Sequence, residues 1–294
     1  MDLRAVVMGL AFALMWASAF SSARMIVVDA PPLAALSVRF VISGVIGVAL
    51  ARAMGQSWHL THSQWRATIV FGLCQNALYL GLNFVAMQTV EASVAAIIAS
   101  TMPLLVALAG WAAFGEKLGV SDGLGLVAGI VGVGVIMGAR MGTGTLDLFG
   151  VGLCVIGVVS LTIATLAMRG ASSGGNFLMV VGLQMLIGAV PLAVLSGLTE
   201  TMEVTWSSRL VLAFLYTTLV PGLAATLVWF LLVDRIGATR AATYHFLTPF
   251  FGVAIAALLL DEPLGWQDAL GVAIITAGIF AVQKARASRA MAKA

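Results

Sequence analysis

PLLVALAGWAAFGEKL at residues 103–118 and PFFGVAIAALLLDEPL at residues 249–264 are two copies of one pattern, an apolar segment that begins at proline and ends at glutamate and leucine. The copies lie 146 residues apart, and the same offset pairs Asp122 with Asp268 beyond them. Proline, glutamate and aspartate are rare within apolar segments, so their agreement at one offset indicates an internal repeat. We therefore predict that the chain consists of two homologous halves.

The composition places both halves in a membrane. The chain has 294 residues, of which 61% are hydrophobic and 9% are charged, and its mean hydropathy is +1.08. About 20 apolar residues suffice for a helix to cross the hydrocarbon core of a bilayer. The sequence contains ten runs of this kind, at 5–23, 33–51, 67–88, 92–114, 119–139, 147–168, 176–198, 209–232, 238–260 and 266–283.

The predicted fold is an all-α membrane protein with ten transmembrane helices in two inverted repeats, 1–141 and 146–284, followed by a basic cytoplasmic tail at 285–294. Each repeat has five helices, an odd number, so the second enters the membrane upside down. Inverted repeats around a central cavity are typical of secondary transporters. A passive channel can share this symmetry and stays an alternative. The first run also resembles a cleavable signal peptide, but its removal would leave the first repeat one helix short.

Basic residues are distributed unevenly in the predicted topology. With a cytoplasmic N-terminus, 11 of the 15 lysines and arginines lie on the cytoplasmic side, as the positive-inside rule favours. We expect a multi-pass protein of a bacterial-type inner membrane with both termini in the cytoplasm. The net charge of +3 is assigned to loops that face anionic lipid, and no nucleic-acid partner is expected.

The sequence shows no catalytic pattern. It lacks a glycine-rich phosphate-binding motif, a plausible Ser–His–Asp set and a cluster of histidine, cysteine and carboxylate residues. We predict that the protein is not an enzyme, needs no cofactor or metal, and has the lipid bilayer and a small-molecule substrate as partners. The glycine-rich runs 119–139 and 266–283 predict a scaffold or a homodimer face, so monomer and homodimer both stay open.

Polar residues in the third apolar run are spaced by four positions. Gln75, Tyr79 and Asn83 therefore share one face of a helix. In lipid this face would leave amides and a hydroxyl without hydrogen bonds. It lines a wet cavity, or it bonds to neighbouring helices; both interpretations stay open.

Further candidates for a substrate site lie at membrane depth. A tryptophan in the middle of a span, such as Trp16, is unusual because most lie in the interfacial belts. His245 is the one group among the candidates that titrates near neutrality. The full set of substrate-binding candidates is Trp16, Gln75, Tyr79, Asn83, Ser100, Trp229, Tyr244 and His245. Pro103 and Pro249 are candidates for kinks or gating, although packing alone can explain a proline kink.

Charged residues give fewer indications. Arg39 either anchors a carboxylate or snorkels outward to the interface, and the second interpretation is the simpler one. Glu116 and Glu262 lie at helix ends and are expected to be structural, meeting neighbouring helix termini. No carboxylate lies in the middle of a predicted span.

Several motifs resemble the EamA-type transporters of the drug/metabolite transporter superfamily. They are WASAF at 16–20, LSVRF at 36–40, the alanine-rich stretch 92–96, PLL at 103–105 and GEKL at 115–118, with second copies at Pro249 and at 261–264. The second copy has Asp261 where Gly115 stands, which affects only a loop.

This resemblance implies ten helices, a central cavity and export of amino acids or other small metabolites. The overall sequence is similar to bacterial aromatic amino-acid exporters. Aromatic side chains among the candidates would stack on a substrate ring, and Gln75 and Asn83 would bind the zwitterion. A multidrug or lipophilic-compound effluxer is the alternative.

Overall fold

The computed structural model describes residues 3–115, 119–142, 147–167, 175–236, 241 and 243–291. These residues form helices and no strand. In this part of the chain, nine helices are long and apolar enough to cross a membrane, and a shorter apolar helix covers Tyr244–Leu260. The ten regions correspond in order to the ten predicted runs, so the all-α membrane fold is confirmed.

The helices form two compact units, and each unit combines segments of both repeats. The first unit comprises residues 1–21, 90–151 and 224–294, and the second comprises 22–89 and 152–223. The first contains the start of α1 (Leu3–Asp29) with α5 (Ala92–Ser100), α6 (Met102–Phe114), α7 (Val120–Gly142), α11 (Ala225–Ile236), η3 (Thr243–Leu247), α13 (Thr248–Leu260) and α14 (Trp266–Met291). The second contains the end of α1 with α2 (Pro32–Ala53), α3 (His62–Phe71), η1 (Gly72–Leu80), α4 (Gly81–Ala86), most of α8 (Leu148–Ala167), α9 (Phe177–Thr199), α10 (Ser208–Thr217) and η2 (Thr218–Ala224).

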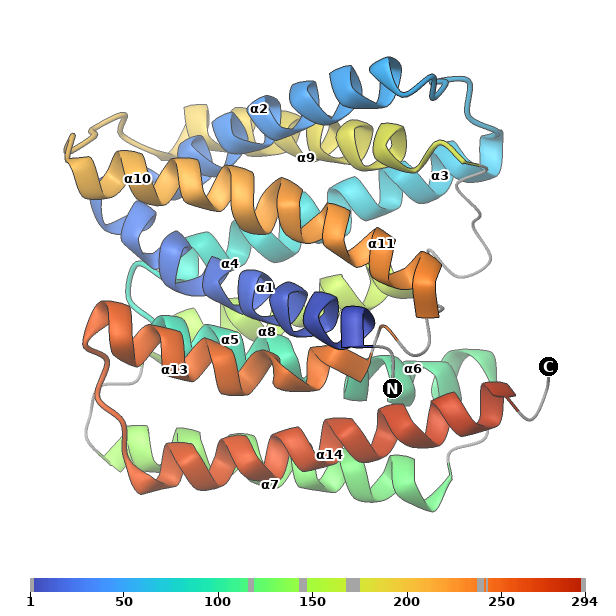
Figure 1. Ribbon diagram of the computed structural model, residues 1–294. Coiled ribbons are helices and arrows are strands. Elements are labelled where there is room, and N and C mark those ends of the chain that lie inside the picture. Colours follow the sequence, from blue (N-terminus) through green and yellow to red (C-terminus); the bar gives the residue numbers. More distant parts are fainter. Residues whose placement is uncertain are drawn as a thin grey trace. The chain divides into compact units, whose positions relative to one another are not determined.

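Within the first unit, α7 and α14 lie side by side (Figure 1) and meet through glycines. A Cβ atom built on Gly125 would lie 2.7 Å from the carbonyl oxygen of Gly278, and one on Gly132 would lie 2.8 Å from that of Gly271. The 146-residue offset pairs Gly125 with Gly271 and Gly132 with Gly278. The contact is therefore reciprocal and antiparallel, which is the geometry of a two-fold axis across the helices.

Within the second unit, α2 packs along α9 in the same manner (Figure 1). A Cβ on Gly44 would lie 3.0 Å from the carbonyl oxygen of Gly182. The hydroxyl of Ser37 donates a hydrogen bond to the carbonyl oxygen of Ala189 at 3.0 Å. Each of these helices thus meets its counterpart from the other repeat.

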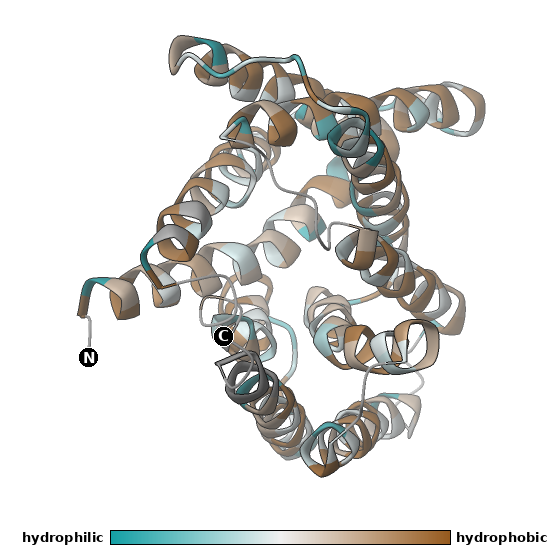
Figure 2. Cartoon of the chain, turned by 90° about the vertical axis from the view of Figure 1, so that its right-hand side faces the viewer, coloured by the Kyte–Doolittle hydropathy of each residue, from teal (hydrophilic) through white to brown (hydrophobic). Residues whose placement is uncertain are grey.

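The faces turned away from these contacts are apolar. On α7, the exposed fractions of Leu124, Val127 and Ile130 are 65%, 59% and 74%. Their spacing of three residues places them on one face of the helix. Figure 2 shows apolar residues along most of the helix surfaces. A surface of this composition is suited to lipid.

Proline marks a break in two corresponding regions. α5 ends at Ser100, and Pro103 lies at the start of α6; Pro249 lies at the start of α13, directly after the short 3₁₀ helix η3. Proline is tolerated in the first turn of a helix because no intrahelical bond to its nitrogen is needed there.

Both proline-led helices also end alike. Gly115 has φ +64°, and Asp261, its counterpart, has φ +53°. Both are left-handed helix ends, a conformation that glycine adopts freely and aspartate tolerates. The exchange of glycine for aspartate between the two copies therefore preserves the turn.

Candidate functional site

Four ring-bearing side chains meet in the first unit. The Phe12 ring lies 5.9 Å from Trp16, 4.8 Å from Trp229 and 5.0 Å from His245, measured between centroids. His245 also lies 5.9 Å from Trp16 and 5.2 Å from Trp229. We call Phe12, Trp16, Trp229 and His245 the aromatic cluster. It brings together three of the predicted substrate-binding residues.

The local structure explains this convergence. Phe12 and Trp16 are one turn apart on α1 and so share a face. Trp229 comes from α11 and His245 from the short helix η3. Phe12 was missed by the sequence analysis, although its spacing of four from Trp16 was a usable signal. Trp16, Trp229 and His245 are half-buried, so each keeps part of its surface accessible.

Tyr244 packs against the backbone of α1 beside this cluster. A Cβ atom on Gly9 would lie 2.3 Å from the Tyr244 ring, so only glycine leaves room for it. Tyr244 and Trp229 both contact a small apolar core of Ala5 and Leu232. Ser100 is satisfied within its own helix, because its hydroxyl donates to the carbonyl oxygen of Ile97 at 2.7 Å.

The polar face of the third run lies in the second unit. Asn83 donates from Nδ2 to the carbonyl oxygen of Tyr79 at 2.8 Å. Both residues are buried against Gly157 of α8, where an added Cβ would lie 2.9 Å from Asn83 Nδ2. This geometry favours the helix-packing interpretation for Tyr79 and Asn83. Gln75 is half-buried.

A π-helical segment, η1, carries another polar residue that the sequence analysis missed. Asn76 is 2% exposed and donates from Nδ2 to the carbonyl oxygen of Gln184 in α9 at 2.9 Å. A Cβ on Gly188 would lie 2.5 Å from that of Asn76, so the two backbones approach closely. η1 starts at Gly72 and η2 at Thr218, which are 146 residues apart. The π-helical geometry is therefore repeated in both halves.

Arg39 does not snorkel. It is 6% exposed, so the simpler interpretation from sequence is wrong.

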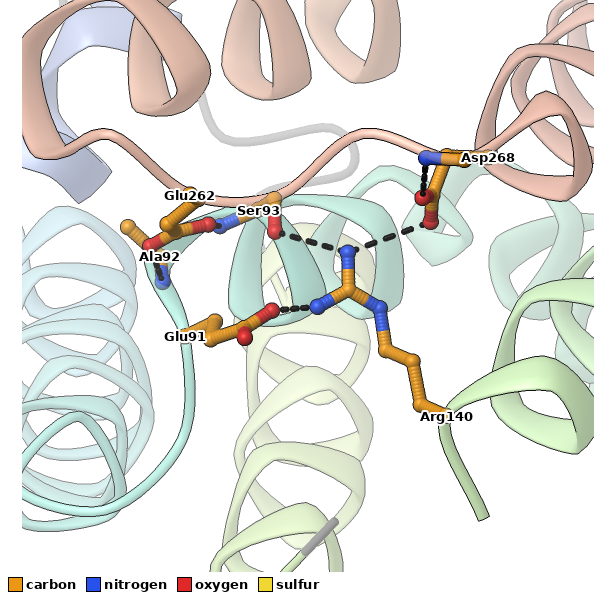
Figure 3. Close-up of polar contacts among 7 residues, drawn as sticks. Glu91, Ala92, Ser93, Arg140, Glu262 and Asp268 are labelled. Carbon is orange, nitrogen blue, oxygen red and sulfur yellow. Dashed lines mark hydrogen bonds and ion pairs between the residues drawn. The ribbon is translucent and has the colours of Figure 1, made fainter. Parts of the chain in front are cut away.

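Glu262 joins two helix ends in the first unit (Figure 3). Its carboxylate accepts hydrogen bonds from the backbone N–H groups of Ala92 and Ser93 at 2.7 and 3.0 Å. A carboxylate at a helix N-terminus is stabilised by the free N–H groups there. The expected structural role of Glu262 is thereby confirmed; Glu116 lies outside the described residues.

Arg140 connects three helices at the same end (Figure 3). It forms an ion pair with Glu91, and its Nη2 donates to Asp268 at 3.1 Å and to Ser93 at 3.3 Å. Arg140 is 8% exposed and Asp268 is 7% exposed.

Comparison with known proteins agrees with this architecture. The sequence pattern of the EamA-like transporter family matches residues 3–138 and 148–283. The uncharacterized transporter YvbV of Bacillus subtilis (strain 168) is 28% identical over 281 residues, covering 95% of this chain and 92% of its own. Protein PecM of Dickeya dadantii (strain 3937) is 22% identical over 266 residues, covering 90% of this chain and 86% of its own.

A crystal structure with 21% sequence identity has the same fold. It superposes with a TM-score of 0.70 and covers 98% of this chain and 100% of its own. The pattern matches span both halves and together take in most of the chain. This protein belongs to the EamA-like transporter family.

Proposed function

We propose that this transporter exports amino acids or related small metabolites, with aromatic amino acids preferred, by alternating access across a bacterial-type inner membrane. The aromatic cluster is the observation that carries the proposal. Phe12, Trp16 and Trp229 present ring faces and edges, and a substrate ring gains about 0.5–1.5 kcal/mol from such a contact beyond its buried area. His245 adds a hydrogen-bonding group with no fixed charge at neutral pH.

A multidrug effluxer is the alternative, since an aromatic cluster also accepts lipophilic compounds. Efflux of lipophilic cations is favoured by a buried carboxylate at membrane depth. Among the described residues, the buried carboxylates Asp122 and Asp268 lie in the first turns of α7 and α14. There they accept hydrogen bonds from the backbone N–H groups of Gly119 and Gly265. This placement supports an uncharged or zwitterionic substrate.

Trp229→Ala is expected to raise the KM for L-phenylalanine by roughly 3–10-fold, because one ring contact is lost. The KM for L-threonine should change little. The measurement is uptake of labelled amino acids into vesicles reconstituted with the purified protein. Trp229→Phe should restore most of the preference for phenylalanine.

Trp111→Ala is the matched control. Trp111 lies on α6 with 52% of its surface exposed, outside the aromatic cluster. Trp111→Ala should leave the KM values for L-phenylalanine and L-threonine unchanged. If wild-type vesicles take up neither amino acid but take up a lipophilic dye, the effluxer is the correct assignment. Equal losses for phenylalanine and threonine in Trp229→Ala would remove the aromatic preference from the proposal.

A further inference from the structure

Arg39 of α2 carries a buried charge whose hydrogen bonds are incomplete. Its Nε is buried without a hydrogen-bond partner, and so is the Oγ of Ser43, one turn further along the helix. The guanidinium carbon lies 5.3 Å from the centroid of the Phe40 ring, but a ring face offsets only part of the cost of burying a charge. A buried arginine with incomplete hydrogen bonds within a membrane helix would be stabilised by a neighbouring anion.

No carboxylate of the second unit supplies that anion. Glu200 caps the N-terminus of α2, where two backbone N–H groups donate to it at 2.8 and 2.9 Å. Asp29 accepts a hydrogen bond from the hydroxyl of Ser207 at 3.2 Å. Glu203 is exposed in the segment before α10. These are the acidic residues of that unit, all of them described, and none forms an ion pair with Arg39.

A difference between the two repeats lies beside Arg39. The 146-residue offset pairs Gly222 of η2 with Asn76 of η1. Asn76 completes its contact with α9 through its own amide, at 2.9 Å from the carbonyl oxygen of Gln184. Gly222 has no side chain, and a Cβ there would lie 3.4 Å from Arg39 Nη2 and 3.6 Å from Ser43 Oγ. The second copy therefore has no side chain at the position that faces the buried Arg39 and Ser43.

Pro221 helps to explain why the backbone of η2 is π-helical. It lies inside η2, where it removes one backbone donor and disturbs the α-helical bonding pattern. Helices depart from α geometry at such positions, often where they serve a function. η2 and Arg39 thus meet at a place where the main chain is irregular and a polar side chain is incompletely bonded.

We propose that Arg39, Ser43 and the backbone at Gly222 form a binding site for a carboxylate. A carboxylate supplies the missing negative charge and two acceptor oxygens, the pattern that a guanidinium fork and a hydroxyl bind best. The identification of this group as the carboxylate of a transported amino acid rests on the function proposed above. The site itself rests on the burial and incomplete bonding of Arg39 and Ser43.

The test compares acids with their amides, which have similar shape but lack the negative charge of the carboxylate. Binding to the purified protein in detergent is measured as the ligand-dependent rise in unfolding temperature. The probes are L-phenylalanine, L-threonine and L-lactate, each beside its amide. Wild type should bind the acids on the order of tenfold more tightly than the amides, as expected for hydrogen bonds to a charged group. Arg39→Gln should bind acid and amide alike.

Three further measurements separate binding from folding. Arg39→Gln without ligand should unfold at the same temperature as wild type or higher, because an unpaired buried charge has been removed. Gly222→Ala should weaken binding of the acids, since its Cβ would lie 3.1 Å from the carbonyl oxygen of Thr217 and 3.4 Å from Arg39 Nη2. Gly197→Ala, whose Cβ would meet nothing within 4 Å, should bind as wild type does.

The outcomes distinguish the site from the function. Equal binding of acids and amides by wild type overturns the carboxylate site, and so does an unchanged preference in Arg39→Gln. If lactate is the one acid that binds more tightly than its amide, and Arg39→Gln abolishes this difference, the carboxylate site is supported and the proposed amino-acid function is wrong. If phenylalanine is transported but the wild-type protein binds acids and amides equally, the proposed function is supported and the carboxylate site is wrong.

Discussion

Gly132→Val is expected to separate α7 from α14 and to leave little folded protein in the membrane. The added Cβ would lie 2.8 Å from the carbonyl oxygen of Gly271 and 2.6 Å from the side chain of Ile275. A backbone oxygen cannot rotate away, so the helices must move apart. Overpacking of this kind costs about 3 kcal/mol, a large share of the stability of a domain.

Unfolding can be followed as the loss of helical circular dichroism on heating, which reports on the helices of both units. Gly134→Val is the matched control: it adds the same side chain to the same helix, where a Cβ would meet nothing within 4 Å. Gly278→Val, the repeat counterpart of Gly132→Val, should be as harmful. If Gly132→Val and Gly134→Val unfold at the same temperature, the close approach of α7 to α14 is wrong.

The number and order of the helices were predictable, because an apolar run of about 20 residues has few alternatives to a membrane helix. The ends of the helices were less predictable. The third run was predicted to begin at residue 67, whereas α3 begins at His62. Thr61 and Gln64 form a capping box there, and polar capping residues lie outside what hydropathy detects. The last run was predicted to end at 283, and α14 continues to Met291.

The candidate site was predictable in part. Trp16, Trp229 and His245 were chosen for their depth, and they meet in the first unit. Asn76 was missed because the periodicity argument assumed an α-helix, while the segment is π-helical. The packing of Asn83 against Gly157 was also unpredictable, since Gly157 lies on α8 and a distant glycine gives no signal of what packs on it.

Arg39 shows where local sequence reasoning stops. An arginine within an apolar helix is interpreted by default as an interfacial residue, because a long side chain can usually reach water. Arg39 is buried all the same, and Gly222, which is far away in sequence and lies in η2, is next to it. The repeat offset pairs Gly222 with Asn76. Only the contacts of the two residues show that the asparagine bonds to α9 whereas the glycine lies beside Arg39.

Arg140→Met is expected to destabilise the first unit most strongly among changes to charged residues. Arg140 pairs with both Glu91 and Asp268, and its loss leaves two carboxylates without their cation. Removing one partner of a buried ion pair costs about 3–5 kcal/mol. Glu91 directly precedes α5, Arg140 lies in the last turn of α7, and Asp268 lies in the first turn of α14. The substitution should therefore loosen three helices at one end.

The cause of this loss can be isolated by removing the carboxylate charges as well. The triple variant Arg140→Met, Glu91→Gln, Asp268→Asn should regain much of the lost unfolding temperature, because no uncompensated charge stays buried. Arg209→Met is the control for loss of a cation alone, since Arg209 is exposed on α10, and it should unfold as wild type does. The cluster of Figure 3 contributes no stability if Arg140→Met also unfolds at the wild-type temperature. A triple variant no more stable than Arg140→Met would mean that the arginine acts through packing of its side chain and not through its charge.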